Sequence, residues 1–183
     1  AFAVYRSEGN GQFLHVSRRY GIGALGGLFV GFGTCCRDFN SDGFVDIAVA
    51  NGHVIKFPLS SPRRQVPLLL CWKGEQFRRF EAASGSYFGT PHDGRGLAAG
   101  DFDNDGDLDL AISNLNAPVA VLENKFPLAP QHACVALVGK QSNRDGVGAR
   151  VTLLAGEGVE PVSETQVVGG GSYLSHHDQK IFL

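Results

Sequence analysis

A block of residues recurs along the chain at a fixed spacing, and this repeat constrains the fold more than any other feature of the sequence. The segment 33–49 aligns without a gap with the segment 96–112, so that Asp38 recurs 63 positions later as Asp101. A second landmark, Gly-Gln-Phe at 11–13, recurs as Glu-Gln-Phe at 75–77. Self-similarity at a period of this length indicates a repeat architecture, in which each unit buries its apolar face against a neighbouring unit.

Each unit contains short apolar runs that end at turn residues. Runs at 46–50, 54–57, 67–72, 109–113 and 119–123 favour β-strands. About four strands per unit is typical of a β-propeller blade, and roughly 4–8 blades are needed to close a propeller. We therefore expect an all-β chain, with about two blades of a partial β-propeller followed by a small β-domain. The missing propeller blades of the same polypeptide would be partners that cover the sheet edges.

Composition agrees with this fold and excludes several function classes. Glycine contributes 25 of the 183 residues and hydrophobic residues 43%, so a turn-rich chain with a packed core is expected. The formal net charge is -2, which argues against a nucleic-acid partner, because phosphate binding needs a clear excess of cationic groups. No apolar run approaches the roughly 20 residues of a membrane span. Because the sequence lacks Met and any signal-peptide pattern, we expect a fragment of a longer protein.

Acidic residues concentrate in two loops that the repeat places in equivalent positions. The windows 38–46 and 101–109 both fit D-x-[DN]-x-D-G-x-x-D. Two carboxylates about 4 Å apart repel by roughly 4 kcal/mol at an effective dielectric constant near 20, so a cluster of them implies a counterion. Oxygen-only ligands favour Ca²⁺. The expected Ca²⁺ ligands, at two sites, are Asp38, Asn40, Asp42, the Phe44 carbonyl and Asp46, and then Asp101, Asp103, Asp105, the Asp107 carbonyl and Asp109.

Two other interpretations of these loops were weighed. An EF-hand needs a bidentate Glu at position 12, where this chain has Val49 and Ile112, and it needs helical flanks, so it is rejected. The alternative that both loops are solvated acidic turns stays open. The second loop carries one more ligating carboxylate than the first, so we expect it to bind more tightly.

Other reactive side chains show no arrangement that indicates catalysis. Cys35, Cys36, Cys71 and Cys134 have no metal-site spacing and favour small apolar core positions; a disulfide from Cys71 to Cys35 or Cys36 is the alternative. The run 176–178 (His-His-Asp) is interpreted as solvated surface, since neighbours in an extended segment face opposite ways. The pairs His92-Asp93 and Arg63-Arg64 are interpreted as loop residues and solvent contacts.

Two known families resemble parts of the chain. The Phe32-Gly33 pair and the two acidic loops resemble the FG-GAP/VCBS repeat, the calcium-loop blade of integrin α-chain propellers, and the segment 6–13 resembles the turn between outer strands of such a blade. The run 142–151 and the run 169–175 resemble the ASPIC/UnbV domain of cartilage acidic protein and of many bacterial proteins. We therefore divide the chain into FG-GAP/VCBS blades over 1–126 and an ASPIC/UnbV-like β-domain over 127–183, which we expect to be truncated.

The resemblance implies a function class rather than a reaction. It implies a calcium-binding β-propeller scaffold that is secreted or faces the bacterial cell envelope and binds an extracellular protein or carbohydrate ligand, as in cell adhesion. We expect no enzymatic activity in this chain. The alternative is a non-catalytic piece of a secreted propeller enzyme whose active site lies in the missing blades, and fold alone does not separate the two.

Overall fold

The computed structural model describes residues 2–25, 27, 29–59, 61–126, 133–154, 156 and 161–182. The predicted domain boundary between residues 126 and 127 adjoins the segment 127–132, which lies outside the described residues, so the boundary stays a prediction.

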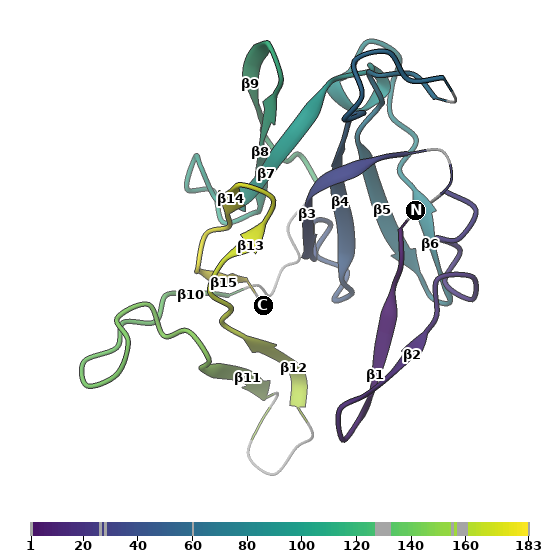
Figure 1. The fold of residues 1–183 in the computed structure, drawn as a ribbon. Coiled ribbons are helices and arrows are strands. Elements are labelled where there is room, and N and C mark those ends of the chain that lie inside the picture. Colours follow the sequence, from purple (N-terminus) through teal and green to yellow (C-terminus); the bar gives the residue numbers. More distant parts are fainter. Residues whose placement is uncertain are drawn as a thin grey trace.

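The chain is all-β, as predicted, and two antiparallel sheets form its centre (Figure 1). We call the four-stranded sheet the first blade and the three-stranded sheet the second blade. The first blade consists of β3 (Gly31–Arg37), β4 (Asp46–Asn51), β5 (Leu68–Lys73) and β6 (Gln76–Arg79), in that order. The second blade consists of β7 (Gly94–Gly100), β8 (Asp109–Asn114) and β9 (Ala117–Leu122), and a short 3-10 helix, η1 (Tyr87–Gly89), precedes it.

Smaller antiparallel pairs flank the two blades. The strands β1 (Tyr5–Gly9) and β2 (Gln12–His15) form an N-terminal hairpin. The C-terminal pairs are β10 (Cys134–Val135) with β15 (Ile181–Phe182), β11 (Arg150–Leu154) with β12 (Pro161–Gln166), and β13 (Gly171–Ser172) with β14 (Ser175–His176).

The repeat seen in the sequence extends to strand register. Thr34 pairs with Val49 in the first blade, and the residues 63 positions later, Leu97 and Ile112, pair in the second. Both strand pairs also carry an irregularity at the same place, just before Thr34 and just before Leu97. The two sequence segments therefore build the same pair of strands, including its bulge.

The blades differ in the connection from their second to their third strand. Leu115 and Asn116 form a tight turn between β8 and β9, and Asn116 adopts a positive φ of 57°. In the first blade the equivalent connection is the long excursion 52–67. The strand that we predicted at 54–57 is wrong, because this run lies in the excursion with Val54 and Phe57 exposed to solvent. Because this run pairs with no neighbouring strand, its backbone forms no hydrogen-bond ladder.

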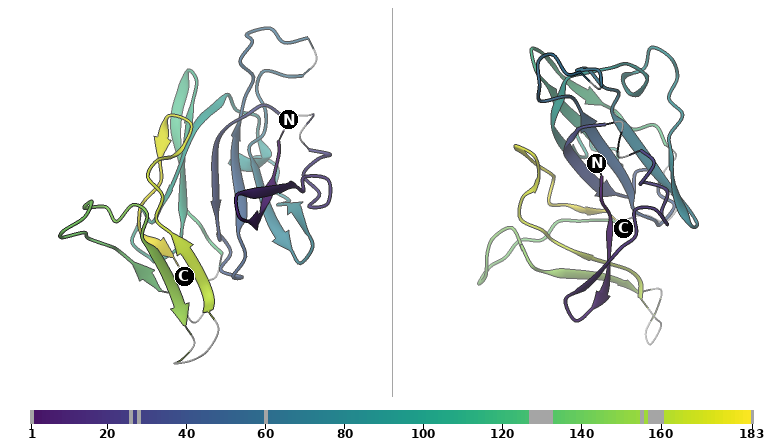
Figure 2. Two further views of the ribbon diagram at one scale, coloured as in Figure 1. Left: turned by 60° about the horizontal axis from the view of Figure 1, so that its bottom comes forward. Right: turned by 45° about the vertical axis from the view of Figure 1, so that its right-hand side comes forward.

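The first strands of the two blades, β3 and β7, lie side by side (Figures 1 and 2). Small side chains allow this approach: a Cβ atom added to Gly33 would lie 2.4 Å from the Leu97 nitrogen and 2.8 Å from the Arg95 carbonyl oxygen. A continuous core fills the space between the blades. Its buried members are Cys35, Phe39, Ala48, Ala50, Leu69, Cys71, Leu97, Ala99, Leu108, Leu110 and Ile112.

The cysteines divide into two classes. Cys35 and Cys71 are buried in the core, as predicted, and burial raises the pKa of the Cys35 thiol to about 12. Cys36 and Cys134 are exposed, so the core prediction is wrong for these two. All four are free thiols, and the alternative disulfide from Cys71 is not formed in the structure.

A second core cluster covers the other face of the first blade. Ile22 and Phe29, from the segment between β2 and β3, pack with Val49, Leu68 and Leu70. The hairpin β1–β2 precedes this segment, and its Gly-Gln-Phe landmark begins β2 much as Glu-Gln-Phe enters β6. Segment 6–13 therefore forms a hairpin, like β5–β6, and its place as the outer turn of a blade stays a prediction.

The approach of β3 to β7 gives a testable prediction. The substitution Gly33→Ala should lower the free energy of unfolding by about 1–3 kcal/mol, because the new methyl group meets backbone atoms that cannot move aside independently. Chemical denaturation followed by tryptophan fluorescence measures this change. Gly23→Ala is the control, since its added Cβ would find the nearest atom at 3.5 Å, an ordinary contact. Equal stability of the two variants would contradict the tight packing of the blades.

Candidate metal centre

Both acidic loops connect the first strand of a blade to the second, and their backbones follow the same path. Ser41 and Asn104 occupy equivalent positions with φ values of 56° and 63°. Gly43 and Gly106 follow two residues later with φ values of 84° and 97°. The left-handed conformation favours glycine, so the Asp-Gly pair fixes the turn that brings the carboxylates round.

The last aspartate of each loop is buried and holds the loop to the third strand of its blade. The Asp46 carboxylate accepts hydrogen bonds from the backbone N–H groups of Phe39 (3.2 Å) and Trp72 (3.0 Å). The Asp109 carboxylate accepts them from Phe102 (3.0 Å) and Asn124 (2.8 Å). Burial raises the pKa of Asp46, and the two hydrogen bonds oppose that rise. These two carboxylates therefore have a structural role with or without a cation.

Three carboxylates of the second loop converge. Asp101, Asp103 and Asp109 each place one oxygen within 4.8 Å of the others. Asp101 Oδ1 is buried and has no hydrogen-bond partner, although a buried polar atom normally has one. Carboxylate oxygens gathered in this way fit a hard cation such as Ca²⁺, so these residues suit the predicted ion.

Asp105 and Asp107 lie outside this group of three. Asp105 accepts a hydrogen bond from the Asp107 backbone N–H at 3.1 Å. The Asp107 side chain is buried, and burial followed by the negative charge of Asp105 raises its pKa to about 6. We predicted a role only for the Asp107 carbonyl, and nothing in the sequence pattern distinguishes its side chain from an exposed one. The buried Asp107 carboxylate is therefore a further acidic group in the second loop.

The first loop is arranged differently. The Asp38 carboxylate accepts hydrogen bonds from the backbone N–H groups of Asn40, Asp42 and Gly43, the shortest at 2.8 Å. Phe44 is exposed at the position equivalent to the buried Asp107. Within the described residues, the acids of this loop form no group of three like that of the second loop. The first loop therefore uses Asp38 to satisfy its own backbone, whereas the second leaves Asp101 Oδ1 without a partner.

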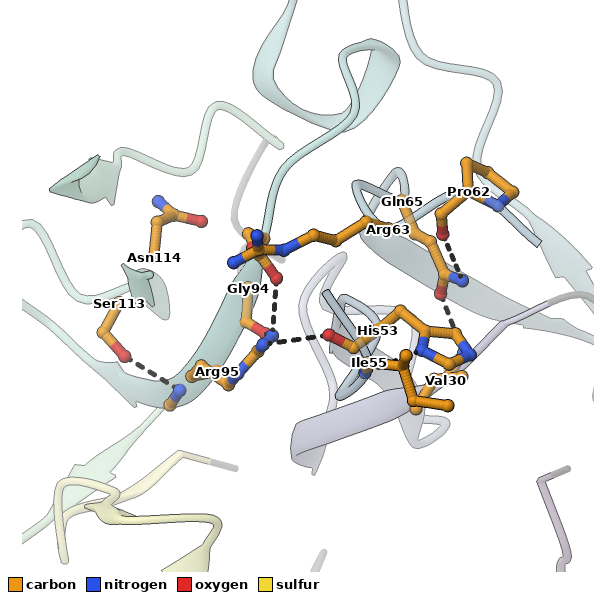
Figure 3. Close-up of polar contacts among 12 residues, drawn as sticks. Val30, His53, Ile55, Pro62, Arg63, Gln65, Gly94, Arg95, Ser113 and Asn114 are labelled. Carbon is orange, nitrogen blue, oxygen red and sulfur yellow. Dashed lines mark hydrogen bonds and ion pairs between the residues drawn. The ribbon is translucent and has the colours of Figure 1, made fainter. Parts of the chain in front are cut away.

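A buried ion-pair network lies at the other end of the blades and was missed by the sequence analysis. Asp93 is 6% exposed and pairs with Arg63 at 2.8 Å and with Arg95 at 2.9 Å. Arg95 also donates to the His53 carbonyl oxygen (Figure 3). Its guanidinium lies over the Phe32 ring. Asp93 lies in a loop, as interpreted, but it is buried, and the interpretation of Arg63 as a solvent contact is wrong. The network ties the excursion 52–67 to the start of β7.

The C-terminal segment lies along the free edge of β7. The Leu97 N–H donates to Ser175 Oγ, and Ser175 Oγ donates to the Leu97 carbonyl. Two residues further along β7, the Ala99 N–H donates to His177 Nδ1 at 3.1 Å, and the Asp178 N–H donates to the Ala99 carbonyl. This segment therefore satisfies backbone groups that β8 does not reach.

The interpretation of 176–178 as solvated surface is wrong for His177, which is 6% exposed. His176 is exposed, so the expectation that the two histidines face opposite ways is confirmed. The same segment also reaches β3, where the Thr34 N–H donates to Ser172 Oγ and the Phe32 and Tyr173 rings pack edge to face. The glycine-rich run before it thus leads into a docking segment on both blades.

Two family models match these parts of the chain. An FG-GAP-like repeat model matches residues 38–112, which hold both acidic loops. A model described as ASPIC and UnbV matches residues 139–183. The chain belongs to the FG-GAP repeat proteins that carry a UnbV domain. In these proteins FG-GAP repeats form propeller-like blades, in agreement with the paired sheets of this one.

No curated protein matches this FG-GAP repeat protein. Among the residues that the structure describes, no helix has the length and apolar character needed to cross a membrane. The two family matches indicate a β-propeller-type scaffold. In the FG-GAP protein, the Phe32-Gly33 pair contributes to packing. The Phe32 ring packs against Arg95 and Tyr173, and Gly33 leaves room for the backbone of β7.

The buried aspartates give a prediction that does not need a metal. In EDTA, Asp109→Ala should lower the free energy of unfolding by about 2–4 kcal/mol, because it leaves the N–H groups of Phe102 and Asn124 without an acceptor. Asp103→Ala is the control from the same loop, and its exposed side chain should change stability by less than about 0.5 kcal/mol. Similar losses in both variants, measured by urea denaturation, would contradict the structural role of Asp109.

His177 predicts a pH dependence of stability. Burial, and then the positive charge of Arg37, lowers the pKa of His177 below its usual 6.5, while the Thr34 backbone opposes this and the nearby His176 adds to it. The unfolded chain therefore binds the proton more readily. The contribution of neutral His177 is fully present above about pH 6.5 and is lost as the pH falls below that value.

The measurement is the free energy of unfolding at pH 7.5 and at pH 5.5. The difference between the two should shrink in His177→Asn, whose Oδ1 can still accept from the Ala99 N–H but does not titrate. His53→Asn is the matched control, because His53 Nδ1 accepts from the Ile55 N–H in an exposed loop. If the difference in unfolding free energy between the two pH values is unchanged in His177→Asn, protonation of this histidine does not affect stability.

Proposed function

We propose that this FG-GAP repeat protein is a calcium-dependent scaffold whose two acidic loops hold Ca²⁺ and thereby stiffen the blades. The observation that carries the proposal is the convergence of Asp101, Asp103 and Asp109, together with the unpartnered, buried Asp101 Oδ1. A bound Ca²⁺ would supply the positive charge that offsets the repulsion among these carboxylates.

The side chains of this chain would divide the work. Asp101 and Asp103 offer oxygens from the start of the second loop, and Asp109 offers its remaining lone pairs while both its oxygens stay bonded to backbone N–H groups. In the first loop, Asp38, Asn40, Asp42, Asp46 and the Phe44 carbonyl stay the proposed ligands. Asp38 would have to share its oxygens with three backbone N–H groups, which supports weaker binding there.

The consequence for the fold is that the loops would be tied to the blades from both sides. Asp46 and Asp109 already join each loop to the third strand of its blade. A Ca²⁺ ion that bound both this last aspartate and the residues at the start of the loop would also fix the end of the first strand. We propose that the stiffened blades present a surface to an extracellular protein or carbohydrate, as in adhesion, and we propose no reaction for the chain.

A secreted or envelope-facing location is part of this proposal. Its support is chemical: loops with few ligands and partly exposed acids suit the millimolar affinities of extracellular calcium modules. Asp103 is exposed and the first loop is occupied by its own hydrogen bonds, so neither loop has the closed ligand cage of a tight cytosolic site.

The test is a calorimetric titration of the EDTA-treated chain with Ca²⁺, with melting curves before and after. We expect about two equivalents to bind, and each site to add about 2.7 kcal/mol at a hundredfold excess of Ca²⁺ over its Kd. Asp101→Asn should remove the tighter equivalent and its share of the stabilisation. Asp145→Asn is the charge-matched control, because Asp145 is exposed and lies outside both loops. No heat and no shift in Tm in the unmodified chain would refute the proposal.

A further inference from the structure

Asn124 connects the two acidic loops, although it belongs to neither. It follows the last strand of the second blade, β9, and its side-chain Nδ2 donates to the Phe39 carbonyl at 2.8 Å and to the Leu108 carbonyl at 3.2 Å. Phe39 is in the first loop, and Leu108 directly precedes the last aspartate of the second. The side-chain Oδ1 accepts from the Phe126 N–H, so every polar atom of the amide is engaged.

These contacts complete a continuous chain of hydrogen bonds between the two buried aspartates. The Phe39 N–H donates to Asp46, the Phe39 carbonyl accepts from the Asn124 side chain, and the Asn124 N–H donates to Asp109 at 2.8 Å. Each link joins groups that are wholly or partly buried, where hydrogen bonds are strong and costly to break. Displacement of either aspartate therefore reaches the other through the backbone of Phe39 and through Asn124.

The first blade uses the equivalent position differently. There the N–H group that holds the last aspartate belongs to Trp72, whose ring packs edge to face against Tyr20 and Phe77. Trp72 thus directs its side chain away from the other loop and into an aromatic cluster. The link between loops comes only from the Asn124 side within the described residues, which makes one residue a sufficient target for experiment.

We propose that Asn124 couples the two calcium loops, so that occupancy of either loop raises the calcium affinity of the other. This inference rests on the proposed calcium binding. Calcium held by the second loop fixes Asp109, and Asp109 fixes the backbone of Asn124. The Asn124 side chain then fixes the carbonyl of Phe39, the residue whose N–H supports Asp46. Coupling between two sites must be reciprocal, since each ion raises the affinity for the other by the same factor.

The experiment follows each loop separately by amide NMR during a Ca²⁺ titration. Gly43 reports the first loop and Gly106 the second. Asp42→Asn disables the first loop and should raise the Kd seen at Gly106 by about fivefold or more, the lower range of known couplings. Asp101→Asn disables the second loop and should raise the Kd seen at Gly43 by the same factor.

Asn124→Ala tests the connecting residue. In this background each disabled loop should leave the Kd of the other within about twofold, as expected when the coupling is lost. Asn114→Ala is the matched control: Asn114 also donates from its amide to a carbonyl, that of Pro118, but it is not in the chain of hydrogen bonds. It should keep the full coupling. The amide spectrum in EDTA checks that each variant folds. If Asn124→Ala does not fold, Asn124→Ser is used in its place.

The outcomes separate the coupling from the calcium proposal. If both glycines respond to Ca²⁺ but disabling one loop leaves the other unchanged, the coupling is wrong and calcium binding stands. If coupling persists in the Asn124 variants, the assignment to Asn124 is wrong. If neither glycine responds in the unmodified chain, calcium binding itself is wrong, and the coupling is overturned with it.

Discussion

The two buried aspartates, Asp46 and Asp109, are the constraint on which the rest of the structure depends. Each lies at the start of the second strand of a blade, accepts one N–H from the start of its own loop and one from the third strand, and so closes a triangle of three segments. A carboxylate is suited to this task because it offers two oxygens to two donors and no donor that would itself need a partner. The burial of a charge is costly, and these short bonds offset part of that cost. The loop can then carry further acids at its surface without losing its attachment to the sheet.

A second constraint is the close approach of neighbouring first strands, which explains where the C-terminal segment lies. Gly33 faces Arg95 and Leu97 of β7, and Gly96, its counterpart in the repeat, faces Tyr173 and Ser175. The C-terminal segment thus lies against the second blade at the position where the second blade lies against the first. Its side chains, rather than a regular ladder, satisfy the backbone of β7. The UnbV domain therefore contributes a strand-like cover to the blades, and Gly96 of β7 allows the contact to be close.

The sequence was sufficient for the repeat and the all-β class, because these follow from local spacing and from turn residues at fixed positions. It was not sufficient for features that depend on contacts between distant segments. His177 is indistinguishable from its neighbour His176 until β7 lies beside it. Asp93 becomes a buried ion-pair centre only because the excursion brings Arg63 to it. Equal spacing also concealed the difference between the loops: Asp38 turns to its own backbone, whereas Asp101 keeps an oxygen free.

This divergence of two repeats with one backbone has a physical explanation in what surrounds each loop. In the first loop, Asn40 and the exposed Phe44 replace Asp103 and the buried Asp107, so fewer charges oppose each other and the backbone can use Asp38 as an internal acceptor. In the second loop, the additional carboxylates leave more repulsion than the loop can relieve by itself. Asn124 lies between these two solutions, since it holds the Phe39 carbonyl of the first loop and the Leu108 carbonyl of the second. The loop whose carboxylates converge is thus bonded to the loop whose carboxylates do not, and a displacement in one has a direct structural route to the other.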